Sequence, residues 1–308
     1  MTSGRGAAPI FIYAARMLSA EFRAAVENAL ALCHPGPFDW RPAGRGVDGD
    51  TWRVQAADAA GFLKIADEPQ RLVMEADGLQ ALAGCGAVRV PQVLATGEAG
   101  GTGFLLMEWL ELGRKTSPAA ARLGEALAQQ HQRLGERFGW YRNNFIGATP
   151  QFNASAEDWV QFFRDHRLGL QLRLAAENGY RGDLQERGAL LLQKLPVFFG
   201  SYRPQPSLLH GDLWRGNWGV LQSGEPVIFD PAVHYGDREA DLAMTELFGG
   251  FPQEFYSAYN ATWPLDSGYQ KRRDLYNLYH LLNHLNLFGT GYLAQATAML
   301  TRLLSLVE

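Results

Sequence analysis

Cysteine is scarce in this chain of 308 residues, and the two that occur, Cys33 and Cys85, lie far apart. Two isolated cysteines cannot build the disulfide framework of a small secreted domain, and they lack the spacing of a zinc site. We therefore expect both to be reduced thiols in a cytoplasmic protein. A disulfide between them is the less favoured alternative.

Positive charge is not in excess either, because 28 Lys and Arg stand against 32 Asp and Glu, a formal net charge of −4 at pH 7. Proteins that bind nucleic acid need a cluster of basic residues to meet the phosphates. We therefore expect no nucleic-acid partner. No apolar run approaches the roughly 20 residues that span a bilayer, so we expect no membrane partner.

The chain opens with residues 1–16, which are rich in Ser, Gly and Ala and show no helical or strand pattern. We expect a flexible tail here. A weak targeting segment and an over-extended gene start are the alternatives, and the apolar part is short for a signal peptide. A helix is predicted from residue 19 to about residue 31 by its apolar spacing.

Residues 207–217 are the most informative stretch, because His210, Asp212 and Asn217 follow the spacing H-x-D-x-x-x-x-N. A short apolar run further on ends in Asp230. Phosphoryl transfer needs one carboxylate to accept the proton of the attacking hydroxyl group. It also needs a carboxamide and a second carboxylate to hold the metal ion at the nucleotide phosphates. The pattern predicts Asp212 as catalytic base and Asn217 and Asp230 as Mg²⁺ ligands.

Other interpretations of this segment stay open. A turn rich in Gly, Asn and Asp could simply join two ordinary elements. A metal hydrolase could use His210, Asp212 and His234, and would show hydrolysis without nucleotide. Downstream, Asp241 lies near the start of a predicted helix, where it either braces the catalytic segment from a buried position or simply suits the helix dipole.

A glycine-rich stretch at residues 44–49 matches G-x-G-x-x-G and contains Gly46. A dinucleotide site would require a helix directly after it. Instead, two alternating stretches predict two strands, and the second carries Lys64. This order is typical of kinases, in which the loop backbone and the lysine bind the phosphates.

A helix predicted over residues 68–82 carries Glu75 at a distance suited to pairing with Lys64. A surface lysine and a surface glutamate are the alternatives for these two residues. Further strands are predicted at 88–94 and 103–107. The segment after the second contains Glu108 and Leu110, where the hinge of a kinase meets adenine through its backbone.

Beyond this hinge the pattern turns helical. We expect helices over 117–138, 157–177 and 183–195, and two more within 274–304 that break near 289–291. Between the first two, residues 139–153 form an irregular loop, and loops of this length are often functional. We expect His131 to be a core or surface histidine. His280 and His284 have a spacing that can bind zinc, but the Glu of H-E-x-x-H is absent.

Together these motifs resemble the fructosamine/ketosamine kinases, a family with a protein-kinase-like fold that is related to the aminoglycoside phosphotransferases. The resemblance covers nearly the whole chain after Met17. It is most specific at residues 206–217, where Trp214 follows Asp-Leu, and at residues 236–244, which read Gly-Asp-Arg-Glu-Ala-Asp-Leu-Ala-Met. Arg45 and Asp48 depart from the usual glycine loop, and Arg215 stands where the family commonly has Ser.

The resemblance implies the same roles as the pattern itself: Asp212 as base, Asn217 and Asp230 on the metal, and Lys64 with Glu75 on the phosphates. It further implies the 3-hydroxyl group of a ribulosamine or fructosamine, free or protein-bound, as the acceptor in a deglycation activity. Around that sugar we expect the substrate-binding residues Trp214, Arg215 and Trp218. For Arg215, solvent exposure is the alternative.

We therefore expect an α+β, two-lobed protein-kinase-like fold and a monomer that uses ATP and Mg²⁺. Residues 17–110 would form the N-lobe, a small β-sheet with one key helix, and residues 111–308 a larger, mostly helical C-lobe. Two alternatives remain for the function. One is another small-molecule kinase, of the aminoglycoside or choline type. The other is an inactive binding module of kinase fold.

Overall fold

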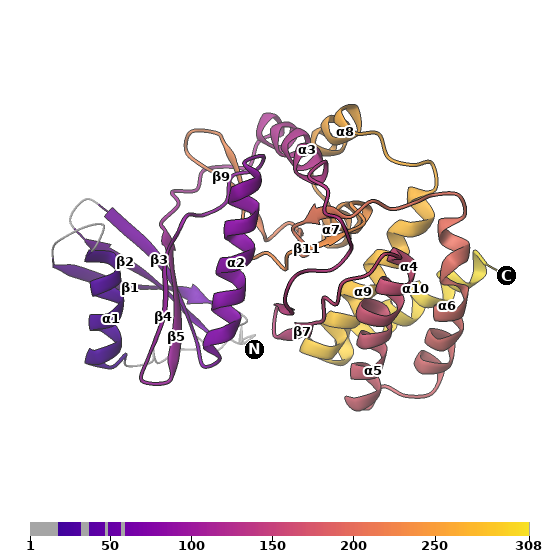
Figure 1. Ribbon diagram of the computed structural model, residues 1–308, viewed down its shortest axis with the longest axis horizontal. Coiled ribbons are helices and arrows are strands. Elements are labelled where there is room, and N and C mark those ends of the chain that lie inside the picture. Colours follow the sequence, from indigo (N-terminus) through magenta and orange to yellow (C-terminus); the bar gives the residue numbers. More distant parts are fainter. Residues whose placement is uncertain (1–17, 32–36, 47–48, 57–58, 308) are drawn as a thin grey trace, which may run out of the picture.

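The computed structural model describes residues 18–31, 37–46, 49–56 and 59–307, with a β-sheet at one end of the molecule and a helical part at the other (Figure 1). The expectations for residues 1–16 and for Cys33 lie outside the described residues. Cys85 is a free thiol. Within the described ranges, no helix has both the length and the apolar character needed to cross a membrane.

The N-terminal part is built on one antiparallel sheet with the strand order β1-β2-β3-β5-β4. Its strands are β1 (Phe38–Arg45), β2 (Asp50–Ala56), β3 (Ala59–Ala66), β4 (Val93–Ala99) and β5 (Thr102–Glu108). Arg45, the last residue of β1, pairs with Asp50, the first residue of β2, so the glycine motif lies where these two strands meet. Lys64, on β3, pairs with Thr51 of β2 on one side and Leu105 of β5 on the other.

Both faces of this sheet are covered, which explains why β5 reads as a continuous apolar run rather than as an alternating one. Phe104 and Leu106 of β5 belong to a core shared with α1 (Ala20–Ala31). Leu105 and Met107 belong to a second core, shared with α2 (Pro69–Cys85). The sheet thus carries α1 in addition to the helix expected to bear Glu75.

The expectation for a strand at residues 88–94 is wrong in its position, since β4 begins only at Val93. Val88 and Val90 are buried, but in a segment that precedes β4 and lies outside the sheet. There the backbone carbonyl of Arg89 accepts a hydrogen bond of 3.0 Å from the N–H of Ile228, in the other part of the molecule. The apolar run therefore marks a junction between the two parts.

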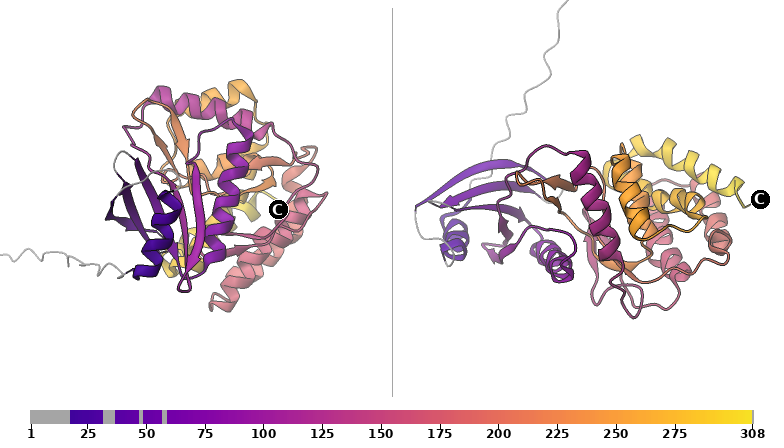
Figure 2. Two further views of the ribbon diagram at one scale, coloured as in Figure 1. Left: turned by 60° about the vertical axis from the view of Figure 1, so that its left-hand side comes forward. Right: turned by 90° about the horizontal axis from the view of Figure 1, so that it is seen from above.

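The C-terminal part is mostly helical, as expected (Figure 2). Its α-helices are α3 (Ser117–His131), α4 (Trp159–Phe163), α5 (Gly169–Glu177), α6 (Asp183–Phe199), α7 (Glu239–Leu247), α8 (Gln253–Thr262), α9 (Tyr269–Phe288) and α10 (Leu293–Ser305). A π-helical turn at Arg164–Leu168 joins α4 to α5. The break expected near residues 289–291 separates α9 from α10.

The helix expected over residues 117–138 ends early, at His131. After it the backbone pairs with other segments: the N–H of Gly135 donates to the carbonyl of Pro206, and the N–H of Phe138 to that of Ala156. Leu134, which continued the apolar stripe in the sequence, is 47% exposed. The helical pattern of apolar residues continues here, but the backbone forms strand-like hydrogen bonds with residues 206–208 instead.

Short strand pairs hold the catalytic segment, residues 207–217. The strands are β6 (Asn144–Ile146), β7 (Thr149–Gln151), β8 (Ser207–Leu209), β9 (Trp218–Val220), β10 (Pro226–Ile228) and β11 (His234–Gly236). β8 pairs with β11 and β9 with β10, all antiparallel. The loop that contains Asp212 therefore runs from one pair to the other, and Asp230 lies two residues after the end of β10.

Candidate active site

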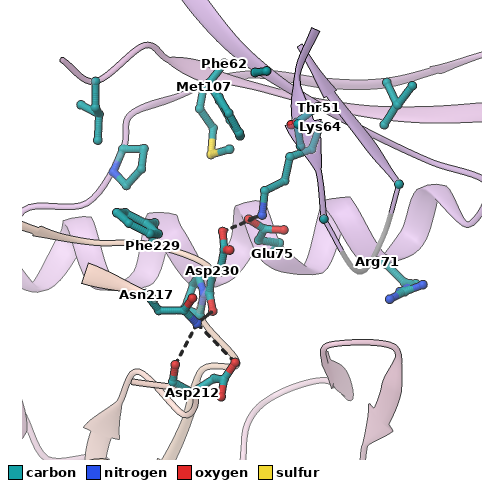
Figure 3. Close-up of a pocket in the computed structure, with 18 of the residues that line it drawn as sticks. Thr51, Phe62, Lys64, Arg71, Glu75, Met107, Asp212, Asn217, Phe229 and Asp230 are labelled. Carbon is teal, nitrogen blue, oxygen red and sulfur yellow. Dashed lines mark hydrogen bonds and ion pairs between the residues drawn. The ribbon is translucent and has the colours of Figure 1, made fainter. Parts of the chain in front are cut away.

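A pocket of about 780 Å³ lies between the sheet and the catalytic segment. Its lining includes Gly46, Lys64, Glu75, Glu108, Leu110, Asp212, Trp214, Asn217 and Asp230. Figure 3 shows Phe62, Met107 and Phe229 together at one end and Arg71 at the other. The volume suits a small-molecule or cofactor site. The structure thus brings together nine of the eleven residues that the sequence singled out.

Asn217 ties the two carboxylate-bearing segments together. Its amide nitrogen, Nδ2, donates to the Asp212 carbonyl (2.9 Å), to Asp212 Oδ2 (3.3 Å) and to the Asp230 carbonyl (3.4 Å). With Nδ2 used in this way, Oδ1 is the atom of that amide suited to ligate a cation. Mg²⁺ prefers oxygen ligands and is commonly held by one or two protein groups together with phosphates. Asn217 Oδ1 and the Asp230 carboxylate fit that role.

Asp230 has a backbone φ of 59°, and it is the only non-glycine residue with positive φ among those described. This conformation is costly for a residue with a side chain and tends to persist at functional sites. Asp230 lies two residues after the end of strand β10, in the connection to β11. The strained backbone places the carboxylate in the pocket beside Lys64 (Figure 3).

Lys64 is held between two carboxylates, with its Nζ 2.7 Å from Glu75 Oε1 and 2.6 Å from Asp230 Oδ1. Burial alone would lower the pKa of Lys64. The carboxylates of Asp230 and Glu75 outweigh it and raise the pKa above its usual value. The lysine is therefore a fixed positive charge in the pocket.

The carboxyl group of Asp212 lies in a less favourable environment for charge. Burial and the nearby carboxylates of Asp230 and Asp241 raise its pKa to about 7, against a smaller opposing effect of the hydrogen bond from Asn217. A carboxylate with a raised pKa binds a proton more readily, which is the property that a general base requires.

A buried network supports the backbone on the N-terminal side of Asp212. Asp241 accepts hydrogen bonds from the N–H groups of His210 (2.7 Å) and Gly211 (2.8 Å). Gly211 has φ 85°, and a Cβ atom there would lie 2.1 Å from the Ala232 carbonyl oxygen, so only glycine fits. The expectation that Asp241 braces the catalytic segment from a buried position is confirmed.

His131 completes this brace from α3. Its Nε2 lies 3.1 Å from Asp241 Oδ2, and its Nδ1 lies 2.9 Å from the hydroxyl of Tyr259. The arrangement fits one tautomer, in which Nε2–H donates to the carboxylate and Nδ1 accepts from the tyrosine. His131 is thus a core histidine, as expected.

His210 has a structural role as well. Its Nε2 lies 3.0 Å from the Phe229 carbonyl, and its Nδ1 accepts from the N–H of Asp212 at 3.2 Å. His234 bonds through Nδ1 to the Ala232 carbonyl. Among the residues that the structure describes, no group of three His, Cys, Asp or Glu could hold a metal ion. Neither the hydrolase alternative nor zinc at His280 and His284 gains support.

The nucleotide side shows how the hinge is fixed. The carboxylate of Glu108 accepts from Arg89 and from the N–H of Gln92, and the N–H of Glu108 donates to the Gln92 carbonyl. Both the side chain and the N–H of Glu108 are therefore engaged within the protein, and the expected contact of adenine with the backbone at Glu108 and Leu110 stays a prediction. At the glycine loop, Gly46 N–H donates to the Gly49 carbonyl at 2.8 Å.

The substrate-side prediction is wrong for Trp218. This ring is 2% exposed and packs against Phe251, with 5.3 Å between ring centroids. Because Trp218 begins strand β9 inside a core, its side chain faces the helices and not the pocket. Arg215 is exposed and also lies outside the pocket lining, so its alternative, solvent exposure, is what the structure shows. Trp214 lines the pocket and is 38% exposed.

Sequence reasoning missed several lining residues, among them Arg71, Asn144 and Pro231. Asn144 is the first residue of β6, within residues 139–153, which contain the hairpin of β6 and β7 and are thus not the wholly irregular loop that the sequence predicted. We call this segment the acceptor loop. The sequence marked this segment as functional by its length alone. Arg71 gave no sequence signal beyond its position one helical turn before Glu75.

Comparison with known proteins places these observations in context. The family model described as fructosamine kinase matches residues 40–306. A Synechocystis protein named "Probable ketoamine kinase" is 48% identical over 246 residues, which cover 79% of this chain and 82% of the relative. A chloroplastic protein-ribulosamine 3-kinase of Arabidopsis thaliana is 40% identical, over 76% of this chain and 72% of that protein.

Solved structures agree with the fold. One from Haemophilus somnus, solved under the name fructosamine-3-kinase, has a TM-score of 0.84 at 28% identity and covers 91% of this chain and 96% of its own. A gentamicin-bound aminoglycoside phosphotransferase has a TM-score of 0.61 at 14% identity, over 92% of this chain and 96% of its own, which shows the fold alone. The expected two-lobed, protein-kinase-like α+β fold is confirmed.

Proposed function

This chain belongs to the fructosamine kinase family, and we propose that it transfers the γ-phosphoryl group of ATP to the 3-hydroxyl group of a ketosamine. One observation carries the proposal: Asp212, Asn217 and Asp230 meet in a pocket that also holds the Lys64–Glu75 pair. Phosphoryl transfer depends on positioning and on stabilisation of charge, and these five side chains supply both.

Asp212 acts as the base in this proposal. It accepts the proton of the attacking sugar hydroxyl, and the hydrogen bond from Asn217 keeps its carboxylate oriented. Asn217 and Asp230 hold Mg²⁺, which when bound neutralises charge on the nucleotide phosphates. Lys64, fixed by Glu75, presents its ammonium group to the same phosphates.

The acids of the pocket support an acceptor with one amine over a polycationic aminoglycoside. Five carboxylates occur in the described lining: Glu75, Glu108, Glu111, Asp212 and Asp230. Glu75 and Asp230 bind Lys64, and Glu108 binds Arg89. Glu111 accepts from the indole of Trp109. These four are thus engaged, Asp212 accepts from Asn217, and Arg71 adds positive charge at the far end.

Aromatic groups remain for the sugar itself. Trp214 offers a partly exposed ring, and Phe145 of the acceptor loop lines the same pocket. The Asn144 amide beside them is engaged within the protein, since it donates to the Val233 carbonyl and accepts from Gln151 and Asn153. A sugar has an apolar C–H face, so an aromatic face suits it. Ribulosamines and fructosamines, free or carried on a protein, both fit this description.

The test is a coupled assay of ADP formation with ATP and Mg²⁺ across ribulosyl-lysine, erythrulosyl-lysine, fructosyl-lysine, kanamycin and choline. We expect the highest kcat/KM for a ketosamine, and phosphate on its 3-oxygen by NMR. A higher value for kanamycin would leave only the broader claim of a small-molecule kinase. If the protein binds ATP but forms no ADP with any of these acceptors, the result would favour the inactive binding module.

We also propose that the protein is a monomer and, on the basis of its low cysteine content, that it works in the cytoplasm. Size-exclusion chromatography with light scattering tests the first point. A mass of twice the 34.1 kDa chain would contradict it.

A further inference from the structure

The side chain of Asp77, on α2, receives two hydrogen bonds from the acceptor loop. Trp140 donates through Nε1 to Asp77 Oδ2 at 3.2 Å, and the hydroxyl of Tyr141 donates to Asp77 Oδ1. Both donors come from neighbouring residues of the C-terminal part, and the acceptor lies on the helix that carries Glu75. One carboxylate thus links the two parts of the molecule.

Asp77 lies two residues after Glu75, so the two carboxylates project from different sides of α2. Glu75 faces Lys64, and Asp77 faces the acceptor loop. The next residue, Gly78, brings the helix close to the segment after Asp230. A Cβ atom at Gly78 would lie 3.1 Å from Val233 Cγ2 and 3.4 Å from Pro231 Cγ. The helix is therefore seated on the C-terminal part at this point.

The acceptor loop makes a second contact with α2 one and a half turns earlier. Arg71 donates through Nη2 to the Gly147 carbonyl at 3.1 Å, and its guanidinium carbon lies 5.6 Å from the centroid of the Phe145 ring. Phe145 and Gly147 also line the pocket. The same loop therefore lines the acceptor end of the pocket and holds the helix that positions Lys64.

From these contacts we propose that Asp77, Trp140 and Tyr141 are positioning residues that couple acceptor binding to nucleotide binding. A bound sugar that orders the acceptor loop strengthens the hydrogen bonds from this loop to Asp77. These bonds fix α2 and, through Glu75, the ammonium group of Lys64. Such coupling is reciprocal, so the acceptor and the nucleotide each raise the affinity for the other. The inference rests on the proposed function for the identity of the acceptor.

Calorimetry with a non-hydrolysable ATP analogue and Mg²⁺, with and without saturating fructosyl-lysine or ribulosyl-lysine, tests this. We expect the acceptor to tighten analogue binding to the wild type about 3- to 10-fold, the size of one or two hydrogen bonds. In Asp77→Ala and in the double variant Trp140→Phe/Tyr141→Phe, the ratio should fall to about 1. Asp77→Asn keeps one acceptor atom and should retain part of the effect.

Gln80→Ala, on the exposed side of the same helix, is the matched control and should keep the wild-type ratio. Combining Asp77→Ala with Tyr141→Phe should add nothing to the single loss, because both remove one interaction. The coupling idea is overturned if the wild type shows no such ratio or if the variants keep it. Failure of the proposed function looks different, since the wild type would then phosphorylate no ketosamine.

Discussion

His131 and Asp241 are joined at 3.1 Å beneath the catalytic segment, although they lie 110 residues apart in the chain. The carboxylate of Asp241 also receives the backbone N–H groups of His210 and Gly211. Burial raises the pKa of Asp241, but the hydrogen bond and the nearby ring of His131 outweigh it and lower the pKa below the usual value. A charged carboxylate therefore holds the backbone directly before Asp212.

Asp241→Asn tests this brace. The amide replaces one acceptor oxygen with a donor that must face a backbone N–H group, leaving a buried polar group unpaired. Such groups cost about 1–3 kcal/mol, so we expect a lower free energy of unfolding in urea and a lower kcat. Unchanged stability together with unchanged kcat would show that the brace is not needed.

Asp212→Asn and Asp230→Asn separate the two proposed roles at the site. Asp212→Asn removes the base and keeps the shape, so we expect ATP binding to persist while kcat falls by roughly 10²–10⁴-fold. Asp230→Asn should instead weaken Mg²⁺-dependent nucleotide binding. Titration of each variant with ATP and Mg²⁺, beside its kcat, checks this. Full turnover in Asp212→Asn would refute the assignment.

The two tryptophans that flank the catalytic segment should behave oppositely. Trp218→Ala empties a core position and should cost about 3–5 kcal/mol of stability, seen as a marked drop in Tm. Trp214→Ala removes a partly exposed ring at the pocket, so Tm should change little while KM for the ketosamine rises. If Trp218→Ala kept its Tm and raised KM instead, the placement of its ring would be wrong.

Two buried histidines predict a pH dependence of stability. Burial, with a smaller effect of Arg167, lowers the pKa of His234 to about 3, and burial next to His284 lowers that of His280 to about 3. An unfolded chain protonates histidine near pH 6.5. Between pH 6.5 and 3 the unfolded state therefore binds more protons. Each histidine then removes about 1.4 kcal/mol of stability per pH unit as pH falls.

Acids with raised pKa oppose this trend, because burial raises the pKa of both Asp212 and Glu239 to about 7. Their folded state binds protons more tightly, so they add stability as pH falls through the same range. The difference between His280→Gln and the wild type isolates the histidine. We expect the stability of the variant relative to the wild type to improve steadily from pH 7 to pH 5 in urea unfolding. A constant difference would contradict the assignment.

The transfer site could be read from the sequence because its parts are close together in the chain. Asp212, Asn217 and Asp230 span 19 residues, and Lys64 and Glu75 lie 11 residues apart on adjacent elements. Local spacing then suffices to bring them together. Strand β1 gave no such signal, because most of its residues are exposed and it contains Pro42.

Side-chain direction was harder to predict. Trp214 and Trp218 flank the same motif, yet one lines the pocket and the other packs on Phe251. The difference depends on where β9 begins and on which face it buries, and neither is encoded in a three-residue strand. Likewise, the link from Asp77 to Trp140 joins residues 63 apart, and only the folded chain brings them together.

At Gly78 the helix α2 meets the side chains of Val233 and Pro231 without a side chain of its own. Because glycine has no Cβ atom, the helix and the catalytic side can approach closely here, and the depth of the pocket depends on this approach. The Cβ atom of an alanine at this position would push the sheet side and the catalytic side apart by a few tenths of an ångström. Substitutions of increasing size at residue 78 would separate the two halves by increasing amounts. Such a series would measure how much separation phosphoryl transfer tolerates.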